Sequence, residues 1–386
     1  MTTIEWLKRL VSFDTTSRNS NLALIDLIQD CFKQHKVSPQ LVFDETRKKA
    51  NLFATLPAHD GSTQGGIILS GHTDVVPVDG QIWDSHPFEA IERDDRIYGR
   101  GTCDMKGFIA VLLHLLPEFR TLKLKKPIHF AFTYDEEIGC LGILTLLKHL
   151  QTLGLNPEGC VIGEPTNMQP VTAHKGRVLY RCRIHGAATH SSLTTQGCNA
   201  IEHAAQLIIY LRSLAEHFKQ KGPFDNAFDV PFTTLTTNMI NGGAAYNIIP
   251  EWCEFAFEFR YLPNLDPKEI ISKIEHYIHE NLLPELHKEH TDATIDLVKI
   301  AEGPGLDTSE EEMITQLIRE LTKIQKKFKV AYATEGGQYQ HSKIPTIICG
   351  PGSIEQAHRP NEFVSIDQLK QCEKIIGQLV HNFVIV

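Results

Sequence analysis

Gly71-His-Thr-Asp-Val-Val-Pro-Val-Asp79 directly follows a short apolar run, Gly66-Ile-Ile-Leu-Ser70. A short apolar run bounded by glycine on both sides predicts a buried strand. His72 and Asp74 would then lie just past the carboxyl end of that strand, where open α/β sheets bind ligands. A histidine followed two residues later by an aspartate suits a metal ligand and the carboxylate that orients it. A polar loop with a satisfied histidine explains this stretch equally well when it is taken alone.

The alternation of strands and helices around this stretch predicts the fold of the larger part of the chain. Helical spacing appears at 3–13, 21–36, 105–122 and 139–153, and strands are expected at about 40–44, 51–56, 66–70, 128–134 and 160–163. After about Glu302 the expected elements are a helix at 308–327, strands at 329–333 and 345–349, and a helix at 366–383. This order predicts an α/β fold with a doubly wound, mostly parallel sheet.

A second pattern begins at about Arg177. The expected order is strand 177–185, helix 198–219, strands 233–239 and 251–261, helix 267–283 and strand 293–299. The order βαββαβ is the ferredoxin-like plan, which makes a small domain of its own. We therefore expect one domain formed by residues 1–176 and 302–386, with a second domain, residues 177–301, inserted into it.

Composition limits the class of protein. The chain has 386 residues, 42% hydrophobic and 22% charged, as expected of a soluble globular protein of two domains. A net charge of -9 argues against nucleic-acid binding, which needs a basic surface. The N-terminus lacks the pattern of a secretory signal, and no apolar run approaches the ~18 residues of a membrane span. We expect a cytoplasmic protein.

The nine cysteines are scattered, and none forms a CxxC pair. That usage fits reduced thiols and excludes a cysteine-type zinc site of the usual spacing. Other common motifs are missing as well: no phosphate-binding Gly-Lys-Ser/Thr loop, no HExxH helix and no GxSxG elbow occurs. Gly242-Gly243 and Gly336-Gly337 are interpreted as turns. If the chain binds metal, histidines and carboxylates must hold it.

Like His72 and Asp74, several other acidic residues and one histidine come directly or shortly after predicted strands. One more acidic residue comes directly before a predicted helix. They are Asp104 before the helix at 105–122, Glu136 and Glu137 after 128–134, Glu164 after 160–163, and His358 after 345–349. Each has an ordinary alternative, such as a helix cap, a turn residue or a loop histidine. Together they predict a centre for two divalent ions, and a nitrogen and oxygen ligand set without thiolate suits Zn, Co or Mn. Glu136 is then left over as a candidate general base.

These motifs resemble those of the di-zinc aminoacylase and peptidase family, and the resemblance covers essentially the whole chain. It rests on Gly71-His-Thr-Asp-Val-Val-Pro77, Gly99-Arg-Gly-Thr-Cys-Asp-Met-Lys-Gly107, Asp135-Glu-Glu-Ile-Gly139, Gly163-Glu-Pro-Thr166 and Gly350-Pro-Gly-Ser353 with Ala357-His358. The resemblance implies two divalent ions, most simply Zn²⁺, with Co²⁺ as a possible substitute. His72 and Glu164 would hold one ion, Glu137 and His358 the other, and Asp104 would bridge them. It further implies Glu136 as the base, Asp74 as a catalytic-site residue and a cis peptide at Asp104–Met105.

The resemblance also assigns roles in the inserted domain, which would be a lid and dimerisation domain of a homodimer. His190 would stabilise the oxyanion in the partner's active site, and Asn247 and Arg260 would bind substrate. A surface histidine near a turn is the alternative for His190, and a surface ion pair the alternative for Arg260. Glu335 lies outside the inserted domain, in a stretch expected at the same edge of the sheet, and would meet a substrate amine, although a polar turn residue explains it equally well.

Within the family, the chain is most similar to the branch that hydrolyses N2-acetyl-L-ornithine to L-ornithine and acetate in arginine synthesis. Thr334-Glu-Gly-Gly-Gln338 departs from the pattern of that branch, which leaves the acyl-amino acid open. The alternatives are N-succinyl-diaminopimelate, N-acetylcitrulline or a dipeptide as substrate. A non-catalytic metal-binding scaffold is a further alternative, against which the presence of Glu136 and a full ligand set argues.

Overall fold

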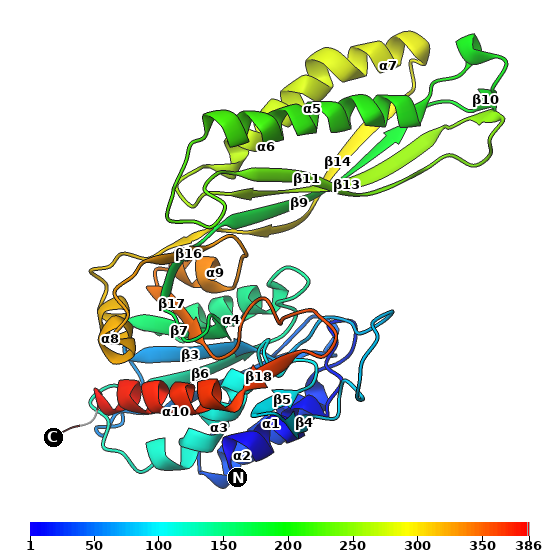
Figure 1. Ribbon diagram of the computed structural model, residues 1–386. Helices are drawn as coiled ribbons and strands as arrows, with labels where there is room; N and C mark the ends of the chain where they lie inside the picture. The colour runs from blue at the N-terminus through cyan, green and yellow to red at the C-terminus, as the bar shows by residue number, and fades with distance from the viewer. Residues whose placement is uncertain (384, 386) are drawn as a thin grey trace. The chain divides into compact units, whose positions relative to one another are not determined.

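The computed structural model describes residues 1–383 and 385, and the chain divides into two compact units. The first unit contains Met1–Ala173, Leu306–Lys329 and Thr334–Val386, and the second contains His174–Gly305 and Val330–Ala333 (Figure 1). No helix in the described part of the chain is long and apolar enough to cross a bilayer.

The first unit is built on a nine-stranded sheet of order β1-β2-β6-β3-β7-β17-β8-β15, with β16 paired to β8. Its strands are β1 (Gln40–Phe43), β2 (Ala50–Leu56), β3 (Ile67–His72), β6 (Ile128–Thr133), β7 (Gly159–Pro165), β8 (Val171–His174), β15 (Leu306–Asp307), β16 (Phe328–Val330) and β17 (Thr346–Gly350). The central strands β6, β3, β7 and β17 run parallel. The carboxyl ends of these four strands therefore share one edge of the sheet.

The sheet is more mixed than the sequence predicts. The pairs β1–β2, β2–β6 and β8–β17 are antiparallel. For β1 and β2 the reason is the short connection between them, closed by the hydrogen bond from Asp44 N to Lys49 O, because a hairpin can join only antiparallel strands. The parallel prediction thus holds for the centre of the sheet and fails at its edges.

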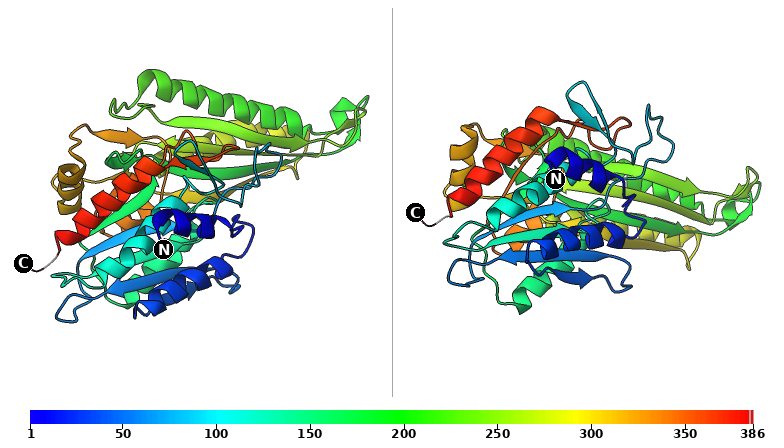
Figure 2. Two further views of the ribbon diagram at one scale, coloured as in Figure 1. Left: turned by 60° about the horizontal axis from the view of Figure 1, so that its bottom comes forward. Right: turned by 90° about the horizontal axis from the view of Figure 1, so that it is seen from below.

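Helices pack on both faces of this sheet. They are α1 (Thr3–Val11), α2 (Leu22–Gln34), α3 (Lys106–Phe119), α4 (Leu141–Thr152), α8 (Met313–Thr322), α9 (Gly336–His341) and α10 (Ile366–His381). α1, α2 and α10 pack around α3, which is buried along most of its length (Figures 1 and 2). α4 and α9 lie on the opposite face of the sheet (Figure 1). The apolar sequence of α3 is explained by this position between the sheet and other helices.

Two local predictions in this unit were wrong, and one small sheet was missed. The expected helix at 308–327 is shorter and occupies Met313–Thr322. Gly336-Gly337 begins α9 instead of forming a turn. A small sheet that the sequence did not predict joins β4 (Ile91–Arg93), β5 (Arg96–Tyr98) and β18 (Phe363–Ser365). Because β18 pairs with β5, the C-terminal segment lies against the loop that precedes Asp104.

The second unit has an antiparallel sheet of order β11-β13-β9-β14. Its elements in chain order are β9 (Gly176–His185), β10 (Thr189–His190), a 3₁₀ turn (Thr194–Gln196), α5 (Ala200–Lys221), β11 (Thr234–Gly242), β12 (Ile248–Ile249), β13 (Trp252–Tyr261), α6 (Pro267–Tyr277), a π-helical segment (Ile278–Leu282), α7 (Leu283–Glu289) and β14 (Thr294–Gly303). Apart from the short β10–β12 pair, this is the βαββαβ order. The strict alternation of burial along β13 shows that one face of the sheet packs against helices.

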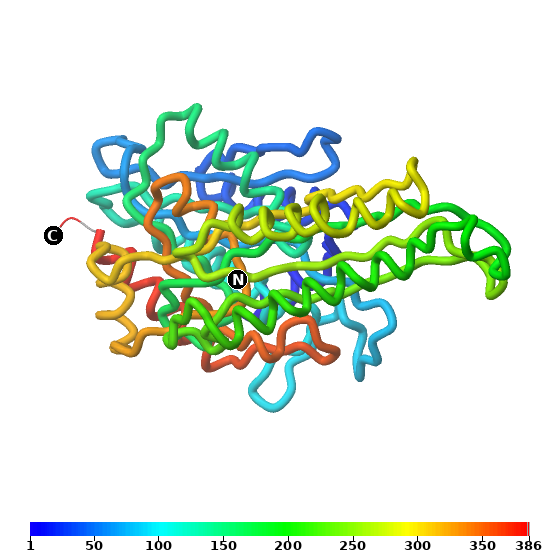
Figure 3. The backbone as a smooth tube through the Cα atoms, turned by 90° about the horizontal axis from the view of Figure 1, so that it is seen from above, coloured from blue at the N-terminus to red at the C-terminus, as the bar shows by residue number. Residues whose placement is uncertain are grey.

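The helices of the second unit lie side by side on that face. Figure 3 shows α5 beside the stretch from α6 to α7, and the rings of Tyr210 and Tyr277 stack between them at 3.9 Å. The helix expected to end at about residue 283 continues, through the π-helical segment, to Glu289. Its added length brings the end of α7 to the beginning of α5.

Candidate metal centre

His72 is the last residue of β3, and its ring is buried. Nδ1 lies 2.9 Å from the carbonyl oxygen of Asp74, and Nε2 lies 2.9 Å from Oδ1 of Asp104. When Nδ1–H donates to that carbonyl, Nε2 faces the carboxylates and can offer its lone pair to a cation held among them. A backbone acceptor of this kind fixes the tautomer and the orientation of a ligating histidine.

Asp74 connects the end of β3 to the turn after β6. Its carboxylate accepts hydrogen bonds from the Ser17 hydroxyl at 2.7 Å and from the backbone N–H groups of Glu136 and Glu137 at 3.1 and 3.3 Å. Burial by itself would raise the pKa of Asp74, but His72 and these donors hold it below its usual value. A charged Asp74 therefore positions both glutamates.

Asp104 lies between two groups of side chains. On one side, His72 Nε2 is 2.9 Å from Asp104 Oδ1 and 3.7 Å from Glu164 Oε1. On the other side, His358 Nε2 is 3.3 Å from Asp104 Oδ2 and 3.0 Å from Glu137 Oε2. Each oxygen of one carboxylate thus faces a different histidine, and each histidine faces a different glutamate. This is the arrangement that a bridging ligand between two ions requires.

The electrostatics of the group fit bound cations. Burial raises the pKa of Glu137 to about 7, and it raises the pKa values of Glu136 and Glu164 well above their usual range. The hydrogen bonds to Asp104 and Glu137 raise the pKa of His358 to about 11. One buried oxygen of Glu137, Oε1, has no hydrogen-bond partner among the described residues. Crowded carboxylates with an unused oxygen fit divalent cations that supply the missing positive charge.

Ligand atoms of two overlapping sets lie within 4.8 Å of one another: one set is His72, Asp104 and Glu137, and the other is His72, Glu136 and Glu164. Glu136, which was predicted to be the base, therefore borders the half of the site that contains Glu164. Its backbone position follows from a tight turn in which Asp135 has a φ of 55° and its carboxylate pairs with Lys49 at 2.5 Å. The Asp104–Met105 peptide is cis, as predicted.

Arg100 and Glu362 form a support for Asp104 that sequence reasoning missed. Oε1 of Glu362 accepts hydrogen bonds from the backbone N–H groups of Cys103 and Asp104, at 2.9 and 3.1 Å. Its other oxygen lies 2.6 Å from Nη1 of Arg100, and both side chains are buried. Arg100 belongs to the motif Gly99–Gly107, but nothing in the spacing of Arg100 and Glu362 indicated that they would pair.

Gln81 extends this support to His358. Its Oε1 accepts from Arg100 Nη2 at 2.6 Å, and its Nε2 donates to the His358 carbonyl at 2.9 Å. His358 itself has a left-handed φ of 65°. The loop that presents the second histidine is therefore held by the same arginine that holds the support of Asp104.

Glu335 lies in the first unit, at the start of α9, and is buried. Burial raises the pKa of its carboxyl to about 8. Its Oε1 has no hydrogen-bond partner within residues 1–383 and 385. The predicted contact with a substrate amine stays a prediction.

The other predicted substrate residues belong to the second unit and fall into two places. His190, on β10, is exposed, and its Nδ1 is 2.8 Å from the Ser192 hydroxyl. Asn247 lies beside it, because its carbonyl accepts from Ser191 N at 2.9 Å. Arg260 lies near the far end of β13 and pairs with Glu258 at 3.0 Å. His190 and Asn247 are thus adjacent, whereas Arg260 is separate from them within this unit.

Residues 68–382 match the model of Peptidase family M20/M25/M40. The chain belongs to this family. It is therefore a metal-dependent hydrolase of the M20 group, in agreement with the metal centre described above.

Relatives in the M20 family resemble the chain over nearly its whole length. Acetylornithine deacetylase of Proteus mirabilis (strain HI4320) is 35% identical over 373 residues, which cover 96% of this chain and 92% of the relative. An M20 family metallo-carboxypeptidase from Sulfolobus solfataricus has the same fold, with a TM-score of 0.75, 17% identity and 98% of both chains covered. A dinuclear metal-binding M20 peptidase of Bacillus subtilis has a TM-score of 0.67, with 15% identity over 99% of this chain and 97% of that one.

Proposed function

We propose that this M20 hydrolase removes the acetyl group from N2-acetyl-L-ornithine, giving L-ornithine and acetate. The hydrolytic chemistry is supported mainly by the position of Asp104. One of its carboxylate oxygens faces His72 and the other faces His358. The substrate rests on the resemblance, at 35% identity over 96% of the chain, to a relative named acetylornithine deacetylase. Such a reaction would belong to arginine synthesis in the cytoplasm.

The residues present would hold two divalent ions, most simply Zn²⁺. His72 and Glu164 would hold one, Glu137 and His358 the other, and Asp104 would contact both. Such ions, when bound, polarise the amide carbonyl and lower the pKa of water. The buried walls of the site strengthen these electrostatic effects, because charges interact more strongly where water is excluded.

Glu136 would act as the general base. Burial, and after it the nearby charges of Glu137 and Asp104, raises the pKa of Glu136 well above its usual range, although His72 opposes this shift. A carboxylate of raised pKa accepts a proton from water readily and can return it to the leaving amine. Asp74 would act by holding the backbone of Glu136 through its 3.1 Å hydrogen bond.

The second unit would serve as the lid and dimerisation domain of a homodimer. In this proposal His190 stabilises the oxyanion, and Asn247 and Arg260 bind the substrate, with the guanidinium on its carboxylate. Arg260 would have to exchange its ion pair with Glu258 for that contact. Glu335 would meet the substrate amine.

Steady-state hydrolysis of four substrates tests the proposal: N2-acetyl-L-ornithine, N-succinyl-L,L-diaminopimelate, N-acetylcitrulline and a dipeptide. Each is measured with chelated protein and with protein reloaded with Zn²⁺ or Co²⁺. We expect kcat/KM for acetylornithine to exceed that for each of the other three substrates by roughly 100-fold, which corresponds to ~2.7 kcal/mol. Activity on all substrates should be lost on chelation. Metal-dependent activity that is highest on another substrate would overturn the substrate assignment. A metal-loaded protein that is inactive on all four would support a non-catalytic scaffold.

A further inference from the structure

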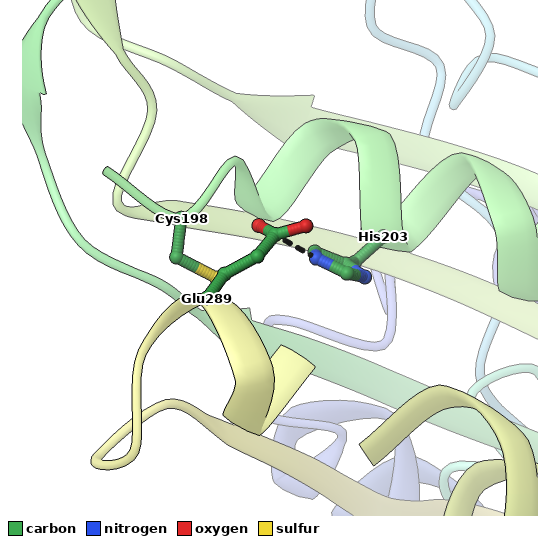
Figure 4. A group of neighbouring side chains, drawn as sticks. All are labelled: Cys198, His203 and Glu289. Atoms are coloured by element: carbon green, nitrogen blue, oxygen red, sulfur yellow. Dashed lines mark ion pairs between the residues drawn. The ribbon is translucent and has the colours of Figure 1, made fainter. Parts of the chain in front are cut away.

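A second group of metal-ligating side chains lies in the second unit, among elements that the proposed reaction does not use. It contains Cys198, His203 and Glu289, and one ligand atom of each lies within 4.8 Å of the others (Figure 4). We call it the Cys198 cluster. Cys198 and His203 are buried, whereas the side chain of Glu289 is 48% exposed.

The backbone holds all three residues in place. Cys198 pairs with Ala187 through two hydrogen bonds of 3.0 Å, one in each direction. His203 lies in the first turn of α5, which begins at the side-chain cap provided by Asn199. Glu289 is the last residue of α7. The cluster is therefore built from an isolated β-bridge, the first turn of α5 and the last residue of α7.

The geometry suits a small divalent ion. His203 Nε2 and Glu289 Oε2 are 3.2 Å apart, close to the separation of about 3.3 Å between two ligands at about 2.0 Å from a tetrahedral zinc ion. In Figure 4, the Glu289 carboxylate faces His203 Nε2. Cys198 lies next to Glu289 on the same side of the histidine ring. Three protein ligands leave a fourth position for water, and the exposed side of Glu289 gives an entry route.

Two ordinary explanations account for parts of the cluster. Cys198 is the residue before the N-cap of α5, and His203 is the fourth residue of the helix. Side chains at these two positions often pack against each other. The Glu289 carboxylate lies at the unfavourable end of its own helix, but it adjoins the favourable start of α5. An ion pair of His203 with Glu289 that joins the two helices without metal is a third explanation, and the experiment below distinguishes it from a metal site.

We propose that the Cys198 cluster is a second metal site, which binds one Zn²⁺ or Co²⁺ through Cys198 Sγ, His203 Nε2 and a Glu289 oxygen. This ion would join the start of α5 to the end of α7. A mixed sulfur, nitrogen and oxygen set favours these two ions over Mg²⁺ or Ca²⁺. The site is independent of the proposed function, because it shares no ligand with the M20 centre.

Two features limit its affinity. His203 Nδ1 is buried without a hydrogen-bond partner among the described residues. The absence of a partner on the second nitrogen of a ligating histidine lowers metal affinity by roughly 10–100-fold. Burial and then the charge of Glu289 raise the pKa of the Cys198 thiol to about 11. Glu289 and His203 each offer a ligand atom within 4.8 Å of this thiol. An ion must displace the thiol proton, which further limits the affinity.

Titration of the metal-free full chain with Co²⁺ tests the site. Thiolate bound to cobalt gives a near-ultraviolet charge-transfer band, and the expected ligands of the M20 centre contain no thiolate. We expect the band in the wild-type chain and its loss, together with one equivalent of bound cobalt, in Cys198→Ser. Cys182→Ala, a change at another buried thiol of the same unit, should retain it.

Glu289→Gln provides a variant with little risk to folding, because this side chain is half exposed. We expect it to weaken thiolate-bound cobalt by roughly 10-fold or more, because the loss of even an outer hydrogen-bond partner of a ligand costs at least that much. Glu285→Gln, on the same helix, should leave the binding unchanged. Absence of the band in the folded wild-type chain at millimolar cobalt would overturn the proposal and leave an ion pair that clamps two helices. Persistence of the band in Cys198→Ser would also overturn it.

Discussion

The guanidinium of Arg100 lies 2.6 Å from the carboxylate of Glu362, and both side chains are buried. The two residues are 262 positions apart in the sequence. Their pairing joins the loop before α3 to the C-terminal segment that also carries His358. Because Glu362 accepts the backbone N–H of Asp104, this ion pair holds the central ligand of the candidate metal centre.

Arg100→Met should strongly destabilise the first unit. The substitution leaves Glu362 as a buried charge without its cation, a change that typically costs about 3–5 kcal/mol. Denaturant unfolding measures the loss. The double variant Arg100→Met with Glu362→Gln should be more stable than Arg100→Met, because an amide is neutral and its oxygen can still accept from Cys103 and Asp104. If both variants were equally stable, the charge argument would be wrong.

Glu136→Gln should lower kcat by about 10²–10⁴-fold, the usual contribution of a general base. Metal content should stay the same, since Glu136 is not among the proposed ligands. Activity and bound metal would be measured on the same preparation, with Glu355→Gln as a control for an exposed glutamate of the same unit. Full activity in Glu136→Gln would remove the base from the mechanism.

Asp104→Asn and His358→Ala should differ in metal stoichiometry. Asp104 faces both halves of the centre, so its amide variant should weaken the binding of both ions. Among the carboxylates of the centre, His358 pairs with Asp104 and Glu137 in the described structure, so its alanine variant should weaken one ion more than the other. Metal analysis after dialysis against a weak chelator distinguishes the two patterns. Equal losses in both variants would contradict a bridging role for Asp104.

His129 should make the first unit less stable in mild acid. Its ring is buried, with Nδ1 2.9 Å from the Thr55 hydroxyl and Nε2 3.0 Å from the Gly65 carbonyl, and burial lowers its pKa from 6.5 to about 4. In the unfolded chain, His129 therefore becomes protonated below about pH 6.5. In the folded chain it stays neutral down to about pH 4. Stability is full above the higher value and falls by about 1.4 kcal/mol per pH unit between the two.

His129→Gln checks this directly. The variant should be less stable than the wild type at pH 7.5, because it disturbs a buried contact with Phe53. Its stability should nevertheless fall less between about pH 6.5 and pH 5. Unfolding curves at several pH values compare the two slopes, and identical slopes would show that His129 does not contribute.

The sequence by itself determined the class of fold and the members of the candidate centre. Alternation of strands and helices predicts parallel central strands, and parallel strands bring their carboxyl ends to one edge. His72 and Glu164 lie at the carboxyl ends of such strands and Glu137 lies just beyond one, so their proximity was predictable from local pattern alone. The βαββαβ order of the second unit was readable for the same reason, because each element has its own periodicity.

Only the tertiary structure decided which atoms meet. The division of the two Asp104 oxygens between His72 and His358, and the pairing of Arg100 with Glu362, depend on segments that are distant in sequence. Glu289 reaches Cys198 and His203 because α7 packs beside α5, and no spacing in the sequence records that contact. Local propensity acts over a few residues, whereas these side chains are placed by the packing of whole helices and strands.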